Sequence, residues 1–439
     1  MTKNRDFKAR VRERMVKTGE RYTAARAQLL AKSADTPDTG AVPNLFAGYR
    51  CAGGVCRDTG AARNFLAQAG LIAKHNGEPI SEAMLAGLGG GVGFLYAVFE
   101  YKGLPPMLSV LARHETMSDT FVFGALSRSG AGLDVSETGS AAAAAKALEA
   151  AIADSRPALA VADVVVLADE SGKSPMQGFA PTVVAVAGVE GDDLLIDEGG
   201  LAPRRLTRER FARARGARKQ AKNRLATVSD RGAKLDLRGA VYEAVAATIE
   251  RYFKSPWKAF ASNVGFAGLE KWQTLMTDPK DKKGWPRLFA DGRAPLALRR
   301  TFQGIEHEFT PPAAGRPMYA RFLEEAGEVT GNRAFGAAAK TFDAAGERWR
   351  AASNFIASCG VPSVESGCEL LDRYSEWLDD PRVGEGGQFS RLYAPPTEAE
   401  PIEPEAALKL FGELADHVGG IIAAEREAVA ALQKAADGA

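Results

Sequence analysis

The spacing of apolar residues separates a mixed α/β part of the chain from a helical part. Runs typical of strands occur at 94–101, 158–167, 182–187 and 194–197. A glycine turn separates the last two runs, which are therefore predicted to form a hairpin. Helical spacing begins after residue 56 and recurs at 81–88 and 141–153. From about residue 235 onward, apolar positions recur every 3.6 residues and predict helices alone.

This pattern predicts an α/β domain followed by an all-α domain. The expected boundaries give three parts: 1–45, a basic helical arm and linker; 46–228, the α/β domain with a mixed sheet; and 229–439, the helical domain. Five apolar residues of the arm can share one face of two short helices broken at Thr18-Gly19: Val11, Met15, Tyr22, Ala25 and Leu29. The arm is either a packing element or a docking segment, and its charge alone does not choose between them.

Composition narrows the class of protein. The net charge is +1 and the hydrophobic content 46%, which predicts a globular chain with no general attraction to nucleic acid or membranes. The charged N-terminus does not resemble a secretory signal, and apolar runs fall short of the ~20 residues that a membrane helix needs. We therefore expect a cytoplasmic protein. Four cysteines without CxxC spacing, and only four histidines, predict no metal site and no disulfide framework.

Cys56 is the best candidate nucleophile. Asp58 and Thr59, both good N-cap residues, follow it and precede a helical pattern, so Cys56 should lie at or just before a helix N-terminus. The partial positive charge of a helix start favours the reactive thiolate. Cys51 is a competing thiol five residues earlier, and both cysteines could instead be ordinary buried thiols.

A glycine-rich turn at 87–93 follows the second predicted helix. The order is helix, glycine loop, strand, whereas a nucleotide-binding loop needs strand, glycine loop, helix, so we exclude nucleotide binding. The glycines are better explained by positive φ angles and close backbone approach.

The residues around Cys56 resemble a known family. VCRDTGAARNFL (55–66), followed by PISEAMLAGLGGGVGF (79–94), is similar to the N-terminal domain of the butirosin biosynthesis protein H family. Asn263-x-Gly265 and the Arg316-x-x-Tyr319 run resemble the helical domain of unknown function that commonly follows it. The resemblance implies a papain-like fold and an acyltransferase that moves an aminoacyl group from a carrier protein to an amine. It implies a phosphopantetheine thioester as donor and no other cofactor.

The resemblance also implies which residues line the substrate cleft. They come from the cysteine motif, the second helix and the glycine turn: Asp58, Thr59, Ser81, Glu82, Gly89, Gly90 and Gly91. Arg50 stands near the place where papain-like enzymes hold an oxyanion-hole glutamine, and a guanidinium could stabilise negative charge there. A salt-bridged surface arginine is the alternative interpretation.

The general base is the main departure from the family pattern. In the resembling proteins the predicted hairpin carries a histidine, with an orienting acid on its second strand. Asp197 matches the acid, but no histidine is present at 180–182. Another histidine, most plausibly His114, could supply the base, the cysteine could act without one, or catalysis could be lost.

A basic segment, Arg204–Arg224, holds ten arginines and lysines against one glutamate. It is either a solvated face or a docking surface for an acidic acyl carrier protein, while nucleic-acid binding is disfavoured because no aromatic residues interleave to stack on bases. We expect a cysteine-dependent acyltransferase of secondary metabolism with a small-molecule amine acceptor. The alternatives are a non-catalytic binding or scaffold protein of the same fold, or a peptidase-like amide hydrolase.

Overall fold

The computed structural model describes residues 3–32, 44–103, 105–113, 117–168, 177–178, 180–290, 292–308, 310–379 and 402–438. By their contacts these residues divide into two compact units. The α/β unit comprises 3–89, 117–237 and 374–379 within the described parts, and the helical unit comprises 90–113, 238–373 and 402–438. Residues 90–113 therefore belong with the helical unit, although they lie inside the segment 46–228.

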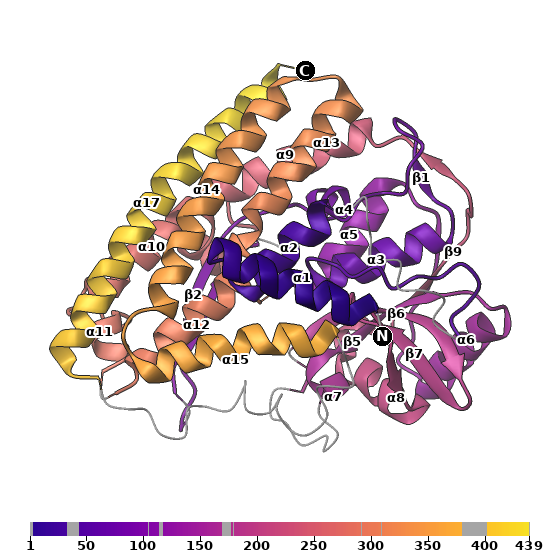
Figure 1. Ribbon diagram of the computed structural model, residues 1–439, viewed down its shortest axis with the longest axis horizontal. Helices are drawn as coiled ribbons and strands as arrows, with labels where there is room; N and C mark the ends of the chain where they lie inside the picture. Colours follow the sequence, from indigo (N-terminus) through magenta and orange to yellow (C-terminus); the bar gives the residue numbers. More distant parts are fainter. Residues whose placement is uncertain are drawn as a thin grey trace. The chain divides into compact units, whose positions relative to one another are not determined.

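The α/β unit contains a sheet flanked by helices (Figure 1). Its helices are α1 (Lys3–Thr18), α2 (Tyr22–Lys32), α3 (Arg57–Gln68), α4 (Glu82–Leu88), α5 (Ser118–Ser129), α6 (Ala141–Ala153), α7 (Val164–Ala168) and α8 (Arg208–Ala217). Its strands are β1 (Ile72–Ala73), β4 (Leu133–Ser136), β5 (Ala158–Asp163), β6 (Pro181–Glu190), β7 (Asp193–Asp197), β8 (Arg204–Leu206), β9 (Leu225–Val228) and β10 (Lys234–Leu235).

The main sheet is antiparallel throughout, so the expectation of a mixed sheet was wrong. Its six strands have the order β4-β9-β5-β6-β7-β8. Strands β4 and β5 are joined through α6 and run in the same direction, but β9 lies between them and pairs antiparallel with both. The predicted hairpin of β6 and β7 is confirmed. A separate short sheet pairs β1 with β10 in parallel.

Alternate residues of each strand point to opposite faces of the sheet, and helices cover both faces. The residues of one face, which include Ala160, Val184 and Ile196, pack against α6, α7 and α8. The register pairs Ala185 with Asp197, so these two residues lie on the other face, where α3 and α5 pack against β6. The fold thus places a carboxylate beneath helix α3.

Residues 164–167 were predicted to extend the strand that begins at 158, but they lie in helix α7. Asp163 causes the change, because its carboxylate accepts a 3.1 Å hydrogen bond from the backbone N–H of Val166. An aspartate that binds an amide three residues ahead acts as a helix N-cap. This local bond outweighs the strand preference of the valines.

The N-terminal arm forms two helices that break after Thr18, and its five predicted apolar residues share one cluster. Helices α1 and α2 bury an apolar cluster against Leu201, in which Phe7, Val11, Tyr22 and Ala25 are buried and Met15, Leu29 and Leu30 are partly buried. The buried Arg26 of α2 donates a 2.5 Å hydrogen bond from Nη1 to the carbonyl oxygen of Gly54. The arm therefore contacts the loop that leads to Cys56.

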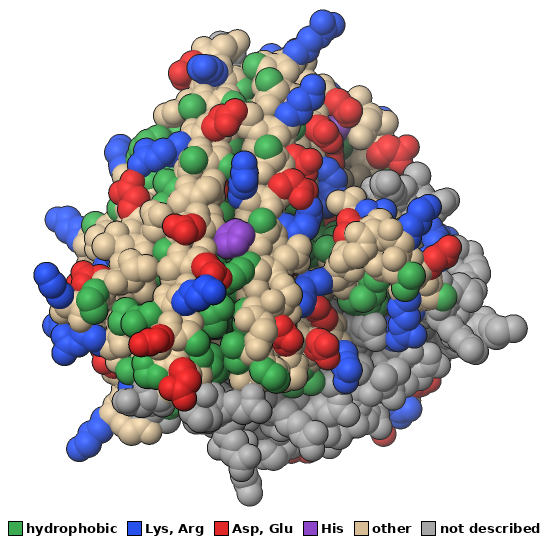
Figure 2. Space-filling model, turned by 60° about the vertical axis from the view of Figure 1, so that its left-hand side comes forward, with side chains coloured by type: hydrophobic (Ala, Val, Ile, Leu, Met, Phe, Trp, Pro, Cys, Tyr) green, Lys and Arg blue, Asp and Glu red, His purple; other side chains and the backbone are tan. Residues whose placement is uncertain are grey.

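The helical unit is built mainly from long helices, with α14 and α17 side by side (Figure 1). Its helices are α9 (Arg238–Phe253), α10 (Gly265–Thr277), α11 (Trp285–Leu288), α12 (Ala294–Glu306), α13 (Arg316–Thr330), α14 (Ala334–Ala357), most of α15 (Pro362–Asp379) and α17 (Pro404–Asp437), and its strands are β2 (Leu95–Phe99) and β3 (Met107–Leu111). The rings of Trp272 and Trp349 stack in its core with centroids 6.0 Å apart. Figure 2 shows acidic and basic side chains interspersed on the described part of one face.

Arg316, singled out in the sequence, is the polar centre of the helical unit. It is fully buried, and its Nε lies 2.6 Å from Glu425 Oε1. Its other nitrogens donate to three backbone carbonyl oxygens and to the hydroxyl of Tyr252, while Trp349 also donates to Glu425. The buried charge of Arg316 is tolerated because acceptors surround the N–H groups of its guanidinium.

We predict that Arg316→Leu lowers the free energy of unfolding by about 3–5 kcal/mol, because the substitution leaves Glu425 buried without its cation. Urea denaturation of the full chain measures the effect. The exposed Arg373→Leu is the matched control and should change stability by less than about 1 kcal/mol. Equal stability of the Arg316 variant and the wild type would contradict this assignment.

Candidate active site

Cys56 is itself the N-cap of helix α3. Its backbone is extended (φ −109°, ψ 136°), and its carbonyl oxygen accepts the N–H of Gly60 at 2.9 Å to close the first helical turn. The prediction that Cys56 lies at a helix start is confirmed, but Asp58 and Thr59 lie inside the first turn and do not cap it. The thiol is half-buried, whereas Cys51 is fully buried.

Asp58 contacts the sulfur directly. The Cys56 thiol donates to Asp58 Oδ1 at 3.0 Å, and the same oxygen accepts the backbone N–H of Thr59 at 2.8 Å. The second carboxylate oxygen accepts a 2.7 Å hydrogen bond from the hydroxyl of Ser118, the first residue of α5. Because Asp58 is only 5% exposed, these bonds fix its orientation beside the thiol.

Glu82 holds the backbone that precedes α3. It lies in the first turn of α4, where Ser81 is the N-cap and accepts the N–H of Met84. The two oxygens of Glu82 accept the backbone N–H groups of Cys56 and Val55 at 2.8 and 2.9 Å. The Cys56 amide, a natural oxyanion donor, is therefore already bound to a carboxylate.

Asp197 lies fully buried beneath α3 and joins it to the sheet. Its carboxylate accepts hydrogen bonds from Tyr49 Oη and Asn64 Nδ2 at 2.8 Å each, and from the backbone N–H of Gly199 at 2.8 Å. Besides burial, the negative charge of Asp197 also contributes to the raised pKa of the Cys51 thiol. Burial raises the pKa of Asp197 above its ordinary value, and burial likewise raises the pKa of both Tyr49 and Cys51.

The hydrogen bonds of Asp197 lead to helix α3 and the loop before it, and its role in orienting a general base stays a prediction. Within the described residues, Asp197 accepts hydrogen bonds from Tyr49, Asn64 and Gly199, whereas the thiol and the amide of Cys56 donate to Asp58 and Glu82. Helix α3 therefore connects Cys56 and Asp197. It begins directly after Cys56, and its eighth residue, Asn64, donates to Asp197. Asp197 has the contacts of a residue that holds the helix in position.

Gly199 allows this close packing of helix and sheet. Its φ of +76° favours glycine, and a Cβ atom there would lie 2.3 Å from the carbonyl oxygen of Arg57. The backbone N–H of Gly54 also donates to the carbonyl oxygen of Gly199 at 2.7 Å. The turn after β7 thus sits directly against the start of α3.

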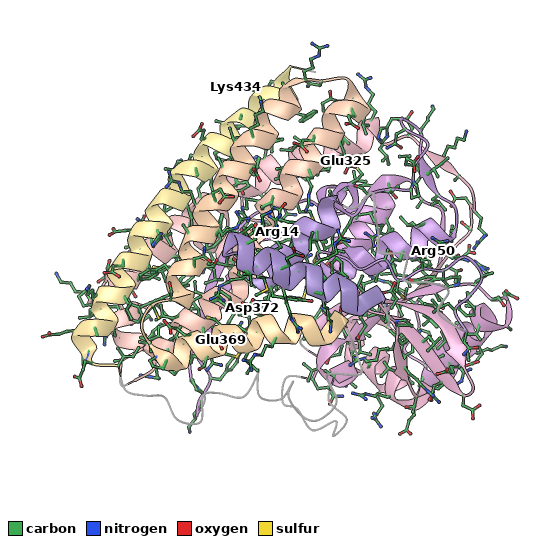
Figure 3. All side chains as sticks on the ribbon, in the orientation of Figure 1. Arg14, Arg50, Glu325, Glu369, Asp372 and Lys434 are labelled. Carbon is green, nitrogen blue, oxygen red and sulfur yellow. The ribbon has the colours of Figure 1, made fainter. Side chains whose placement is uncertain are left out.

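The remaining predicted residues lie in several places. Arg50 is exposed at the surface of the α/β unit (Figure 3). Gly89 is the C-cap of α4, and Gly90 and Gly91 have the positive φ angles that the sequence predicted. A Cβ at Gly91 would overlap the ring of Tyr319, so close approach is also confirmed. His114 lies outside the described residues.

The basic segment is largely neutralised inside the α/β unit. Six of its arginines lie within 4 Å of a carboxylate: Arg204, Arg205, Arg208, Arg213, Arg218 and Arg224. Arg210 and Arg215 donate to backbone carbonyl oxygens instead. Lys219 and Lys222 are exposed. Most of these arginines therefore bind partners within the α/β unit, such as Glu149 of α6 and Leu167 of α7.

Sequence reasoning missed Tyr49, Asn64 and Ser118. Asn64 stands eight residues after Cys56, and this helical spacing was the available signal that it shares a face with the start of α3. Tyr49 and Ser118 had no comparable signal, because their partners lie far away along the chain. Within the described residues, no group of three or more His, Cys, Asp or Glu side chains is placed to hold a metal ion.

The α/β unit is thus defined by a cysteine-capped helix on an antiparallel sheet, with a carboxylate beside the thiol. Residues 58–198 match the family described as butirosin biosynthesis protein H, N-terminal, and residues 205–376 match a domain of unknown function, DUF4872. The chain therefore carries the two domains suspected from its sequence, in the expected order. The first match begins two residues after Cys56. No curated protein matches the chain significantly, and no described helix has the length and apolarity of a membrane span.

We predict that Asp197→Ala lowers the free energy of unfolding by about 2–4 kcal/mol, because it leaves several buried donors without an acceptor. Urea denaturation measures the loss. Arg205→Ala, which removes an exposed ion pair, is the control and should cost less than about 1 kcal/mol.

The loss should depend on pH in a defined direction. Because the pKa of Asp197 is raised in the folded state, that state binds the proton more tightly than the unfolded chain does. The stabilisation by Asp197 is then fullest below the unfolded pKa of about 3.9 and declines as pH rises through the folded pKa. The stability difference between wild type and Asp197→Ala should shrink with rising pH. A difference that grows with pH contradicts the assignment.

Proposed function

We propose that this protein is a cysteine-dependent acyltransferase that moves an acyl group from a thioester to an amine. The observation that carries the proposal is the half-buried Cys56 at the N-cap of α3, with its thiol 3.0 Å from the Asp58 carboxylate. The family match adds a setting, because the name of the family points to biosynthesis of a butirosin-like secondary metabolite.

A papain-like arrangement is part of this proposal. Three features support it: a long helix that begins at a cysteine, an antiparallel sheet on which that helix packs, and the β6–β7 hairpin that ends at Asp197. In such an arrangement the helix start faces substrate, and its partial positive charge stabilises negative charge on a reacting carbonyl. This partial positive charge matters here because the Cys56 amide, which could otherwise bind the oxyanion, already donates to Glu82.

The reaction has two halves. Cys56 Sγ attacks the thioester carbonyl, a new S–C bond forms, and the donor leaves as a thiol that takes up the proton from Cys56. The amine then attacks the acyl-cysteine, an amide bond forms, and Cys56 leaves and regains a proton from the amine. The first half needs a group that accepts the thiol proton.

Transfer fits the site better than amide hydrolysis. A thiol leaves readily, whereas an amine leaves only when a strong acid protonates it, and papain-like peptidases use an imidazolium for that step. The described partner of the Cys56 thiol is a carboxylate. A carboxylate is a weak base and suits the easier thioester reaction.

The donor and the base remain proposals. A phosphopantetheine thioester on a carrier protein is suggested by the family resemblance, and docking through the basic segment would depend chiefly on the exposed Lys219 and Lys222. His114 stands four residues before Ser118, whose hydroxyl bonds to Asp58. It is therefore retained as the histidine candidate for the base.

We predict that Cys56→Ala reduces acyl transfer to the uncatalysed rate, because it removes the nucleophile. S-acetyl-N-acetylcysteamine serves as donor and n-butylamine as acceptor, and mass spectrometry measures the N-butylacetamide formed. Cys359→Ala removes another partly exposed thiol and should leave the rate unchanged. Cys51→Ala tests the competing thiol.

Turnover by folded Cys56→Ala at the wild-type rate would exclude Cys56 as the nucleophile. Loss of turnover in Cys51→Ala, with its fold retained by circular dichroism, would transfer the role to Cys51. A wild type that makes no product and no acyl-cysteine would favour the non-catalytic alternative.

A further inference from the structure

We propose that Asp58 is the general base of this site, in place of the histidine that the hairpin lacks, and that it also receives the acceptor amine. The inference rests on the proposed acyl transfer and names a catalytic residue for it. Its basis is the contact between Cys56 Sγ and Asp58 Oδ1 at 3.0 Å, which lies within hydrogen-bonding range for a sulfur donor.

The geometry orients Asp58 for this role. A base must lie within hydrogen-bond reach of the proton it removes, and Asp58 Oδ1 already accepts that proton's hydrogen bond. The hydroxyl of Ser118 binds the other oxygen at 2.7 Å, and Thr59 N–H binds Oδ1 at 2.8 Å. These two donors hold the Asp58 carboxylate in the orientation in which Oδ1 lies next to the sulfur.

Glu82 serves a different purpose from Asp58. Its oxygens bind the backbone N–H groups of Val55 and Cys56 and the hydroxyl of Thr59, and Arg63 Nη1 lies 3.9 Å away. A carboxylate so engaged fixes the turn before α3. Asp58 is the carboxylate that accepts a hydrogen bond from the sulfur itself.

The proton can be followed through both half-reactions. Asp58 takes the proton of Cys56 as sulfur attacks the thioester carbonyl, and it returns that proton to the departing donor thiolate. The acylated sulfur then has no hydrogen to donate to Oδ1. An ammonium N–H of the acceptor can take its place, with its nitrogen about 3 Å from Oδ1, and lose one proton there to become a nucleophile.

The second half-reaction restores the starting state. As the amine attacks the acyl carbon, its second proton passes to Asp58 and then to the departing Cys56 thiolate, so the thiol is regenerated. One proton is released to solvent for each ammonium consumed. The acceptor class that this position selects is a cationic amine, because its charge complements the carboxylate.

The test uses two measurements that should move in opposite directions in Asp58→Asn. Acetylation of Cys56 by S-acetyl-N-acetylcysteamine, followed by intact mass in single turnover, should slow by about 100-fold or more, since general-base catalysis contributes 10²–10⁴-fold. Alkylation of Cys56 by iodoacetamide at pH 7 should become several-fold faster, because removal of the neighbouring negative charge favours the thiolate.

Asparagine has nearly the shape of aspartate and can still accept from Thr59, so the variant should remain folded. Asp154→Asn, which changes an exposed carboxylate at the end of α6, is the matched control and should alter neither rate. A merely structural role for Asp58 predicts that both rates fall together. That result would overturn the inference.

His114→Ala provides the competing arm. Under this inference acetylation is retained in that variant, and a loss of about 100-fold in it would return the base to His114. If the wild type is acetylated and Asp58→Asn is acetylated equally fast, the inference fails while the proposed function stands. If the wild type is not acetylated at Cys56, the proposed function itself fails.

Discussion

The arrangement of the site depends on the buried carboxylate of Asp197. Tyr49 from the preceding loop, Asn64 from α3 and the N–H of Gly199 all donate to it. One acceptor therefore joins the sheet, the loop and the helix that carries Cys56. Because its burial is unfavourable for charge, the carboxylate needs this full set of donors, and each donor is held in place in return.

A second carboxylate, Asp58, lies beside the candidate nucleophile. It accepts a hydrogen bond from the Cys56 thiol, and Ser118 donates to its other oxygen. A site with a weaker base is suited to a substrate with a good leaving group. The proposal of thioester chemistry rests on this contact, and the family match adds only a setting in butirosin-like biosynthesis.

Local features could be predicted from the sequence, and long-range ones could not. The helix at Ala141–Ala153 matches its prediction because its pattern and its Ser140 cap are contained in adjacent residues. The valines after Asp163 were assigned to a strand because their apolar run outweighed a single capping residue. The bonds of Asp197 to Tyr49 and Asn64 span 148 and 133 residues, so no local pattern could reveal them. Ser118 was missed for the same reason.

The most direct measurement is peptide mapping of the wild-type chain after brief exposure to an isotope-labelled acyl thioester, without any amine. The account predicts one acyl group per chain, attached to Cys56 and released as an amide when amine is added. A label confined to Cys51, Cys359 or Cys368, or a label on Cys56 that amine cannot remove, would contradict it.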